Sequence, residues 1–135
     1  MLRRYQIMSE RGEPHPDALR NFERAYVPEG KIRYALRDRD KRRPFGVLGY
    51  SEGAGNWEEL HEAIREGLAV WPAVFSHRDE WGVTYDVDMV VSGPSGREAP
   101  VRTKWIYRVG EDFPRLVTLY VRTTQWRREE WREEL

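Results

Sequence analysis

The sequence predicts an α+β fold, in which N-terminal helices pack on an antiparallel meander of three to four strands and a C-terminal helix follows. Two patterns lead to this prediction. Between residues 57 and 71 apolar side chains recur every three or four positions, which is the spacing of one helix face. From residue 83 to residue 121 apolar and polar residues largely alternate, which is typical of strands. Helices followed by strands indicate an α+β arrangement of layers.

The clearest helix is expected to begin after Asn56, because Asn is a favoured N-cap and Glu59 follows three residues later, as in a capping box. Pro72 ends the apolar periodicity of this segment. A shorter helix is expected over residues 32–36, after Pro28, whose fixed φ angle suits a first helical turn. Both helices precede the alternating segments, so they are expected to form one layer against the sheet.

Three strands are expected over residues 83–91, 101–109 and 116–121, joined by turns at 93–96 and 110–114 that contain Gly and Pro. Links this short join neighbouring antiparallel strands, so the three strands form a meander. One face of the last strand is expected to carry Leu116, Thr118 and Tyr120.

The chain length of 135 residues suits a single domain. The polar segment 9–17 contains two Pro and is expected to form a loop. Residues 1–18 are therefore expected to be an N-terminal arm and loop, 19–123 a single α+β domain, and 124–135 a C-terminal helical tail. Weak strand character is expected over 22–27.

The composition excludes several functional classes. There is no Cys, which excludes a disulfide scaffold, Cys-ligated metal sites and thiol catalysis. No apolar run approaches the ~18 residues of a membrane span, and the first residues lack the apolar stretch of a signal peptide. The chain is therefore expected to be a soluble cytoplasmic protein without a membrane partner.

The net charge is zero, which argues against a general polyanion binder. The charges are nevertheless segregated along the chain. Residues 1–50 carry 12 basic and 7 acidic residues, residues 51–90 carry 2 and 9, and residues 91–135 carry 9 and 7, so the three segments have net charges of +5, −7 and +2. A local basic site therefore remains compatible with overall neutrality.

Metal, nucleotide and nucleophile motifs were not found. The three His residues, His15, His61 and His77, include no pair at the spacing of a helical metal site. The glycines at 46–49 and 53–55 match neither a Walker loop nor a dinucleotide-binding fingerprint, and there is no GxSxG elbow. No metal and no cofactor are expected.

A candidate anion or RNA site is indicated on the second expected strand. Arg102 and Lys104 lie on one of its faces, with Thr103 and Trp105 on the other, and Lys41 belongs to the densest basic run of the chain. Basic groups beside hydroxyls and aromatic rings can hold a phosphodiester, stabilise its oxyanion and stack bases. The alternative is a sheet with its aromatic residues in the core and its cations in solvent.

Several blocks of the sequence resemble a bacterial family catalogued as a domain of unknown function. The first block has the form fGxxYxV…GPxGR…VxTxWI and consists here of Gly82, Tyr85, Val87, Gly93, Pro94, Gly96, Arg97, Val101, Thr103, Trp105 and Ile106. The second has the form PRLVTxY and consists of Pro114, Arg115, Leu116, Val117, Thr118 and Tyr120. An upstream block of the form HKAxFFxxLG(F/Y) is matched by Lys41, Phe45, Leu48, Gly49 and Tyr50. Asp40 stands where that block has His, and Pro44 where it has an aromatic residue.

The layout of this resemblance is similar to small RNase toxins of the barnase/RelE-like group. It implies a metal-independent site in which Lys41 stabilises phosphate charge and hydroxyl groups orient the scissile group. The residues that the analogy assigns to catalysis are Lys41, Thr103, Thr118 and Tyr120. Those expected to bind substrate are Arg102, Lys104 and Trp105.

Two functions therefore remain open from the sequence. The first is a toxin-like RNA-binding domain or metal-independent RNase, with RNA as its partner. The second is a non-catalytic interaction or assembly module whose partner is another protein or a second copy of the chain. The second function is motivated by the segregated charges and by Trp126 and Trp131 in the tail.

Overall fold

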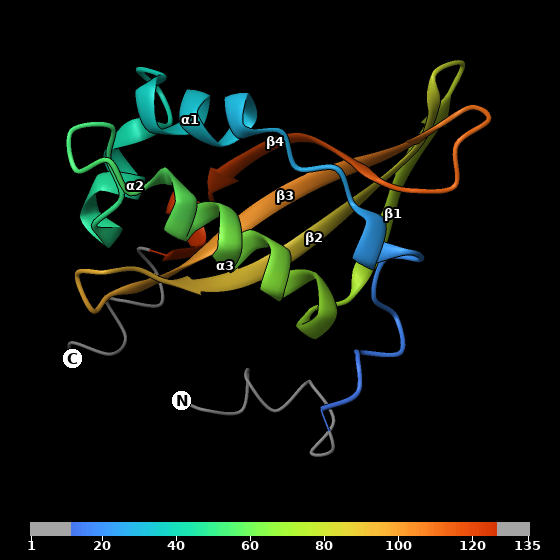
Figure 1. Ribbon diagram of the computed structural model, residues 1–135, viewed down its shortest axis with the longest axis horizontal. Helices are drawn as coiled ribbons and strands as arrows, with labels where there is room; N and C mark the ends of the chain where they lie inside the picture. The colour runs from blue at the N-terminus through green and yellow to red at the C-terminus, as the bar shows by residue number, and fades with distance from the viewer. Residues whose placement is uncertain (1–11, 127–135) are drawn as a thin grey trace.

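The structure, a computed structural model, describes residues 12–126, and these form a layer of helices on one antiparallel sheet (Figure 1). The elements are η2 (Phe22–Arg24), α1 (Glu29–Arg37), α2 (Arg42–Leu48), α3 (Trp57–Val70), β1 (Ala73–Asp79), β2 (Gly82–Ser92), β3 (Glu98–Arg108) and β4 (Arg115–Val121). Residues 123–126 are helical as well. The predicted fold class is confirmed, with helices first, a sheet second and a helix after the last strand.

The sheet has the strand order β1-β2-β3-β4, and each strand is antiparallel to its neighbour. β1 is the fourth strand of the predicted three to four. Its register with β2 slips between Phe75 and His77. This bulge interrupts the alternation of apolar and polar residues that would have marked the segment as a strand. Most side chains of β1 are exposed, because β1 lies at the edge of the sheet.

The strand character expected over residues 22–27 is largely wrong. Phe22–Arg24 forms a 3₁₀ turn, and Tyr26 makes an isolated parallel bridge to Arg115. In that bridge the Tyr26 amide donates to Pro114 O at 2.9 Å, and Tyr26 O accepts from the Leu116 amide at 3.0 Å. The segment therefore adds a single residue to the free edge of β4 rather than a strand.

Asn56 occupies the expected position immediately before α3, but its side chain does not cap the helix. Its Oδ1 accepts from the Ser51 amide at 3.1 Å, and its Nδ2 donates to Gly49 O at 2.8 Å. Asn56 therefore closes the loop between α2 and α3, and the capping box expected from Glu59 is not formed.

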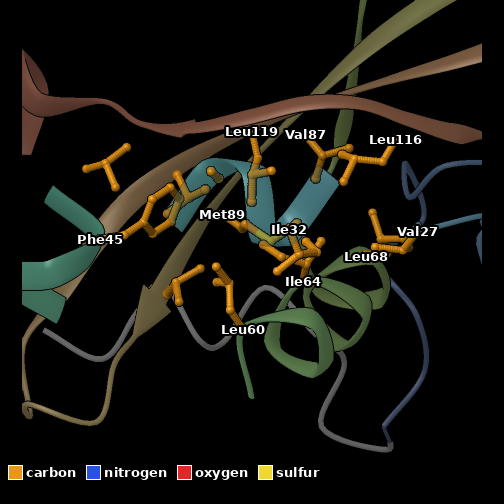
Figure 2. Close-up of a cluster of buried hydrophobic side chains, with 14 of the residues drawn as sticks. Val27, Ile32, Phe45, Leu60, Ile64, Leu68, Val87, Met89, Leu116 and Leu119 are labelled. Carbon is orange, nitrogen blue, oxygen red and sulfur yellow. The ribbon is translucent and has the colours of Figure 1, made fainter. Parts of the chain in front are cut away.

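The core lies between the helices and one face of the sheet, here called the inner face. Figure 2 shows side chains from all three α-helices meeting side chains of β2 and β4 there. The residues labelled in that view are Val27, Ile32, Phe45, Leu60, Ile64, Leu68, Val87, Met89, Leu116 and Leu119, all of which are buried. Gly67 lets α3 approach β2 closely, because a Cβ at this position would lie 2.5 Å from Met89 Sδ.

A bulge in β4 changes which of its side chains reach the core. Lys104 pairs with Thr118 and Trp105 pairs with Leu116, so Val117 is an extra residue in β4. Leu116 and Leu119 are therefore both buried, and the expectation that Leu116 shares a face with Thr118 and Tyr120 is wrong.

Within residues 12–126 no helix is long and apolar enough to cross a membrane. The same residues contain no group of three or more His, Asp or Glu side chains placed to hold a metal ion.

Candidate functional site

The side of the sheet opposite to the inner face carries two rows of polar residues. In antiparallel strands, residues directly opposite each other point to the same face. Asp86 of β2 is opposite Lys104 of β3, which is opposite Thr118 of β4. The neighbouring row consists of Asp88, Arg102 and Tyr120. These six residues, together with Arg122 and Lys41, whose contacts follow, are called the polar face.

Charged groups on the polar face are held by ion pairs. Arg102 donates two hydrogen bonds to Asp88, both at 2.8 Å, and Arg122 donates to Asp88 Oδ2 at 3.1 Å. Lys104 Nζ donates to Asp86 Oδ1 at 2.9 Å. The side chains of Arg102 and Lys104 remain 26% and 29% exposed, so a ligand can still reach them.

The pairing shifts the protonation equilibria of two of these groups. Burial alone raises the pKa of Asp88, but the hydrogen bonds and charge of Arg102 and then Arg122 outweigh it, so this pKa lies below its ordinary value. The hydrogen bond to Asp88 raises the pKa of Arg102. Both groups are therefore charged throughout the neutral range.

Lys41 reaches the edge of the polar face from the turn between α1 and α2, which Figure 1 shows near β4. Its Nζ donates to Thr118 Oγ1 at 2.5 Å and lies 5.5 Å from the centre of the Tyr34 ring. Among the residues that the structure describes, no carboxylate forms an ion pair with Lys41. Partial burial lowers the pKa of Lys41, because the charged form loses hydration.

Asp38 organises the turn that carries Lys41. Its carboxylate accepts from the Tyr34 hydroxyl at 2.8 Å and from the Asp40 amide at 3.1 Å. Its backbone carbonyl accepts from the amides of Lys41 and Arg42 at 3.1 and 2.9 Å. The hydrogen bond from Tyr34 is the main reason why the pKa of Asp38 lies below its ordinary value.

Thr103 and Trp105 lie on the inner face and are completely buried. Trp105 Nε1 donates to Thr103 Oγ1 at 2.7 Å, and Thr103 Oγ1 donates to Val87 O at 2.8 Å. The indole N–H of Trp105 and the hydroxyl of Thr103 are thus both hydrogen-bonded within the core, directly beneath the polar face. The structure thus brings five of the seven candidate residues to one face, namely Lys41, Arg102, Lys104, Thr118 and Tyr120, and places Thr103 and Trp105 on the other.

Several residues of this region were missed from the sequence. Asp86 and Asp88 lie among the polar residues of the alternating segment 83–91, and their pairing with Lys104 and Arg102 becomes visible once the β2–β3 register is known. Asp38, the residue that follows α1, is four residues beyond Tyr34, which is the spacing at which helical side chains meet. That spacing was the available signal for a Tyr34–Asp38 pair.

A close contact fixes α2, and hence the turn before it, against the β2–β3 hairpin. Ser95 donates its amide to Leu48 O and its hydroxyl to Val47 O, both at 2.9 Å. Gly93 allows this approach, because a Cβ on Gly93 would lie 2.1 Å from Leu48 O. Gly49, at a φ of 105°, ends α2 with the left-handed geometry that favours glycine.

A family model described as a domain of unknown function (DUF6883) matches residues 18–123. The chain belongs to the DUF6883 family. The expected resemblance to a family of unknown function is thereby confirmed at the level of the family. The DUF6883 match covers the residues of the polar face, including Lys41 and Arg122. No curated protein matches the chain in sequence.

A solved structure shares the fold of this DUF6883 chain. It is a contact-dependent growth inhibition toxin–immunity protein complex from Klebsiella pneumoniae 342, one chain of which superposes with a TM-score of 0.60. The two chains are 15% identical over 74% of this chain and 95% of the other. At this identity the likeness concerns the fold alone.

Proposed function

We propose that the polar face binds RNA through its phosphates and that the protein is a toxin-like, metal-independent ribonuclease. The observation that carries this proposal is the position of Lys41. Its ammonium lies at the edge of a partly exposed polar sheet face, bonded to a neutral hydroxyl and to no described carboxylate. Such an ammonium can donate to a phosphate oxygen without first breaking an ion pair.

The charge balance of the polar face supports the same ligand. Lys41, Arg102, Lys104 and Arg122 carry four positive charges, and Asp86 and Asp88 carry two negative ones, which leaves an excess of two positive charges (4 − 2). The overall charge of the chain is zero. The excess is therefore local, which favours a bound phosphodiester over a general attraction to polyanions.

RNA cleavage in this proposal uses the nucleophile of the substrate itself. The 2′-hydroxyl gives its proton to a water molecule and attacks the neighbouring phosphorus, while negative charge develops on the non-bridging oxygens. The bond to the 5′-oxygen breaks as that oxygen takes a proton from the Lys41 ammonium, which regains one from solvent, and the products are a 2′,3′-cyclic phosphate and a 5′-hydroxyl. Lys41 stabilises the developing negative charge, while Thr118 and Tyr120 orient the phosphate through their hydroxyl groups. Because partial burial lowers the pKa of Lys41, its ammonium also gives up a proton more readily than an ordinary lysine does.

The remaining candidate residues take supporting roles in this proposal. Arg102 and Lys104 bind neighbouring phosphates from the centre of the face. Thr103 and Trp105 are positioning residues, since they are buried under the strands that carry Arg102, Lys104 and Thr118. The chain that shares the fold belongs to a toxin–immunity protein complex, which is compatible with a toxin-like role and equally with a protein-binding one.

Incubating the purified protein with total RNA in the presence of EDTA tests the proposal. We expect cleavage by the wild type and a loss of about 100-fold or more in Lys41→Ala, the typical effect of removing one donor to a developing oxyanion. Arg78→Ala is the control, because Arg78 is an exposed cation of β1 that lies outside the polar face. Intact RNA with the wild type, or equal cleavage after Lys41→Ala and Thr118→Ala, would contradict the proposal.

A protein-interaction role is the second candidate. At the end of the sheet away from Lys41, Trp81 is 69% exposed and Val109 is 76% exposed, and the Val109 amide donates to Trp81 O at 3.2 Å. Exposed apolar side chains that lie together favour a protein partner. Of the tail that the sequence suggested for assembly, Trp126 is buried in the core and is not free for a partner, and residues 127–135, which include Trp131, lie outside the described residues. Light scattering of the full chain and of a Trp81→Ser variant tests self-association through this end.

A further inference from the structure

We infer that the substrate of the polar face is single-stranded RNA and that Tyr34 is the surface on which one of its unpaired bases stacks. This inference rests on the proposed function, because it names the class of RNA that the Lys41 site receives. Tyr34 lies on α1, it is 51% exposed, and the centre of its ring is 5.5 Å from Lys41 Nζ.

Tyr34 lies on the exposed side of α1. Tyr34 is flanked on α1 by Ala35 and Leu36, which are buried, yet its own ring is half in solvent beside a partly buried ammonium. Four described aromatic side chains are strongly exposed, namely Tyr26, Tyr34, Phe75 and Trp81. Of these, Tyr34 is the one next to Lys41: Tyr26 packs against Arg115, and Phe75 and Trp81 belong to the β1–β2 hairpin.

The ring is also held in place. The Tyr34 hydroxyl donates to Asp38 Oδ1 at 2.8 Å, and the same carboxylate receives the Asp40 amide in the turn that carries Lys41. One carboxylate thus binds both the ring hydroxyl and the backbone of the turn that carries Lys41, whose ammonium is held by Thr118. A rigid aromatic surface loses little conformational entropy when a base stacks on it.

This pairing of an aromatic ring with a phosphate-binding cation is the arrangement that single-stranded nucleic acids require. A groove of cations follows the backbone, and successive bases stack on aromatic side chains with little dependence on sequence. A base within a duplex is already paired and stacked on its neighbours, so its faces are not available to Tyr34. The geometry therefore selects unpaired segments, such as loops and single-stranded ends, over duplex RNA.

A binding experiment tests this inference without interference from cleavage. Fluorescence anisotropy is measured with a labelled 2′-O-methyl oligoribonucleotide, whose blocked 2′-oxygen cannot attack, as a single strand and as a duplex with its complement. We expect tighter binding of the single strand, and a loss of about 5- to 100-fold in that affinity for Tyr34→Ala. Tyr34→Leu, which keeps an apolar side chain without an aromatic face, is expected to lose affinity in the same way.

Tyr34→Phe and Tyr26→Ala are the controls. Tyr34→Phe keeps the ring and loses the bond to Asp38, so we expect its affinity to stay within about twofold of the wild type. Tyr26 is as exposed as Tyr34 but is not next to Lys41, so Tyr26→Ala is expected to bind normally.

Four outcomes would overturn the inference. Equal losses in Tyr34→Phe and Tyr34→Ala would assign Tyr34 to supporting Asp38. Normal binding by Tyr34→Ala together with weakened binding by Lys41→Ala would show that no base stacks on Tyr34. Equal affinity of the wild type for the single strand and for the duplex would show the same. Either result would leave the proposed function standing. Absence of any RNA binding by the wild type would remove both.

Discussion

Thr103 shows how a residue chosen for its hydroxyl group can serve the core. Its Oγ1 accepts from Trp105 Nε1 and donates to Val87 O, so one hydroxyl satisfies a donor and an acceptor where no water is available. A buried polar group is tolerated when its hydrogen bonds are complete and is costly when they are not. Thr103 thereby allows a large indole to lie at the centre of the sheet.

Replacing Thr103 by Val is expected to lower the free energy of unfolding by about 1–3 kcal/mol, because the shape is kept while the buried indole N–H loses its acceptor. Denaturant unfolding of Thr103→Val, Trp105→Phe and the double variant measures this effect. In the Trp105→Phe background there is no indole N–H to leave unpaired, so Thr103→Val should be less harmful there. Equal losses in both backgrounds would show that the Trp105–Thr103 bond does not contribute.

At the scale of elements, the position of Lys41 depends on how α2 meets the β2–β3 hairpin. Ser95 binds the last carbonyls of α2, and Gly93 leaves room for the contact. The turn that carries Lys41 directly precedes α2. A change in this contact is therefore expected to affect both the stability of the fold and the placement of the Lys41 ammonium.

Gly93→Ala is expected to destabilise the protein by about 1–3 kcal/mol, since the added Cβ meets a backbone carbonyl that cannot move alone. Thermal unfolding measures the change, and RNA affinity should fall in the same variant. Gly46→Ala is the matched control: it lies within α2, a Cβ there meets nothing within 4 Å, and Ala favours a helix by about 1 kcal/mol. A Gly93→Ala variant as stable as the wild type would show that the hairpin does not hold α2.

At the scale of the whole molecule, neutrality results from charges that are segregated along the chain and then paired in the fold. The acidic middle segment contributes Asp86 and Asp88 to β2, and the basic C-terminal segment contributes Arg102, Lys104 and Arg122. Folding brings these opposite charges together within one molecule. The excess of positive charge that remains for a ligand is small and lies on the polar face.

This small excess predicts a weak salt dependence of RNA binding. Single-stranded nucleic acids lose affinity with a slope of about −0.7 per neutralised phosphate in a plot of log affinity against log salt. Two uncompensated charges give a slope of about −1.4, and four give about −2.8. We expect the wild type near the first value and an Asp86→Asn/Asp88→Asn variant near the second, as measured by anisotropy titrations at several salt concentrations. A steep slope for the wild type would mean that the ion pairs open on binding.

The sequence was informative where a periodic pattern ran without interruption. The spacing of α3 and the alternation of β2 and β3 predicted the positions of these elements and that Thr103 and Trp105 share one face of β3. The expected roles of Thr103 in catalysis and of Trp105 in substrate binding do not fit the fold, because that face is buried. The sequence analysis did not place β1, and it put Leu116 on the wrong face of β4, for the same physical reason. In each case a bulge shifts the strand register by one residue. Such shifts are fixed by cross-strand pairing and leave little trace in a single strand.

The candidate site could be predicted only in part, because it is assembled by contacts between distant segments. Lys41 and Thr118 are 77 residues apart in the chain, and their contact follows from the way α1 and α2 lie beside β4. Asp38 was not anticipated, since its role arises from the turn that it closes. Residue type and the family resemblance therefore identified chemically suitable residues, and the fold decided which of them meet.

The bridge between Tyr26 and Arg115 has a consequence for how these molecules can associate. It occupies part of the free edge of β4, and α1 packs against the same strand, which leaves β1 as the described edge at which another strand could add. A sheet that can be extended on both sides can polymerise, whereas a sheet extended on one side ends after a single addition. Strand addition through β1 would therefore stop at a pair of molecules, so the blocked edge protects the protein against growth into fibres.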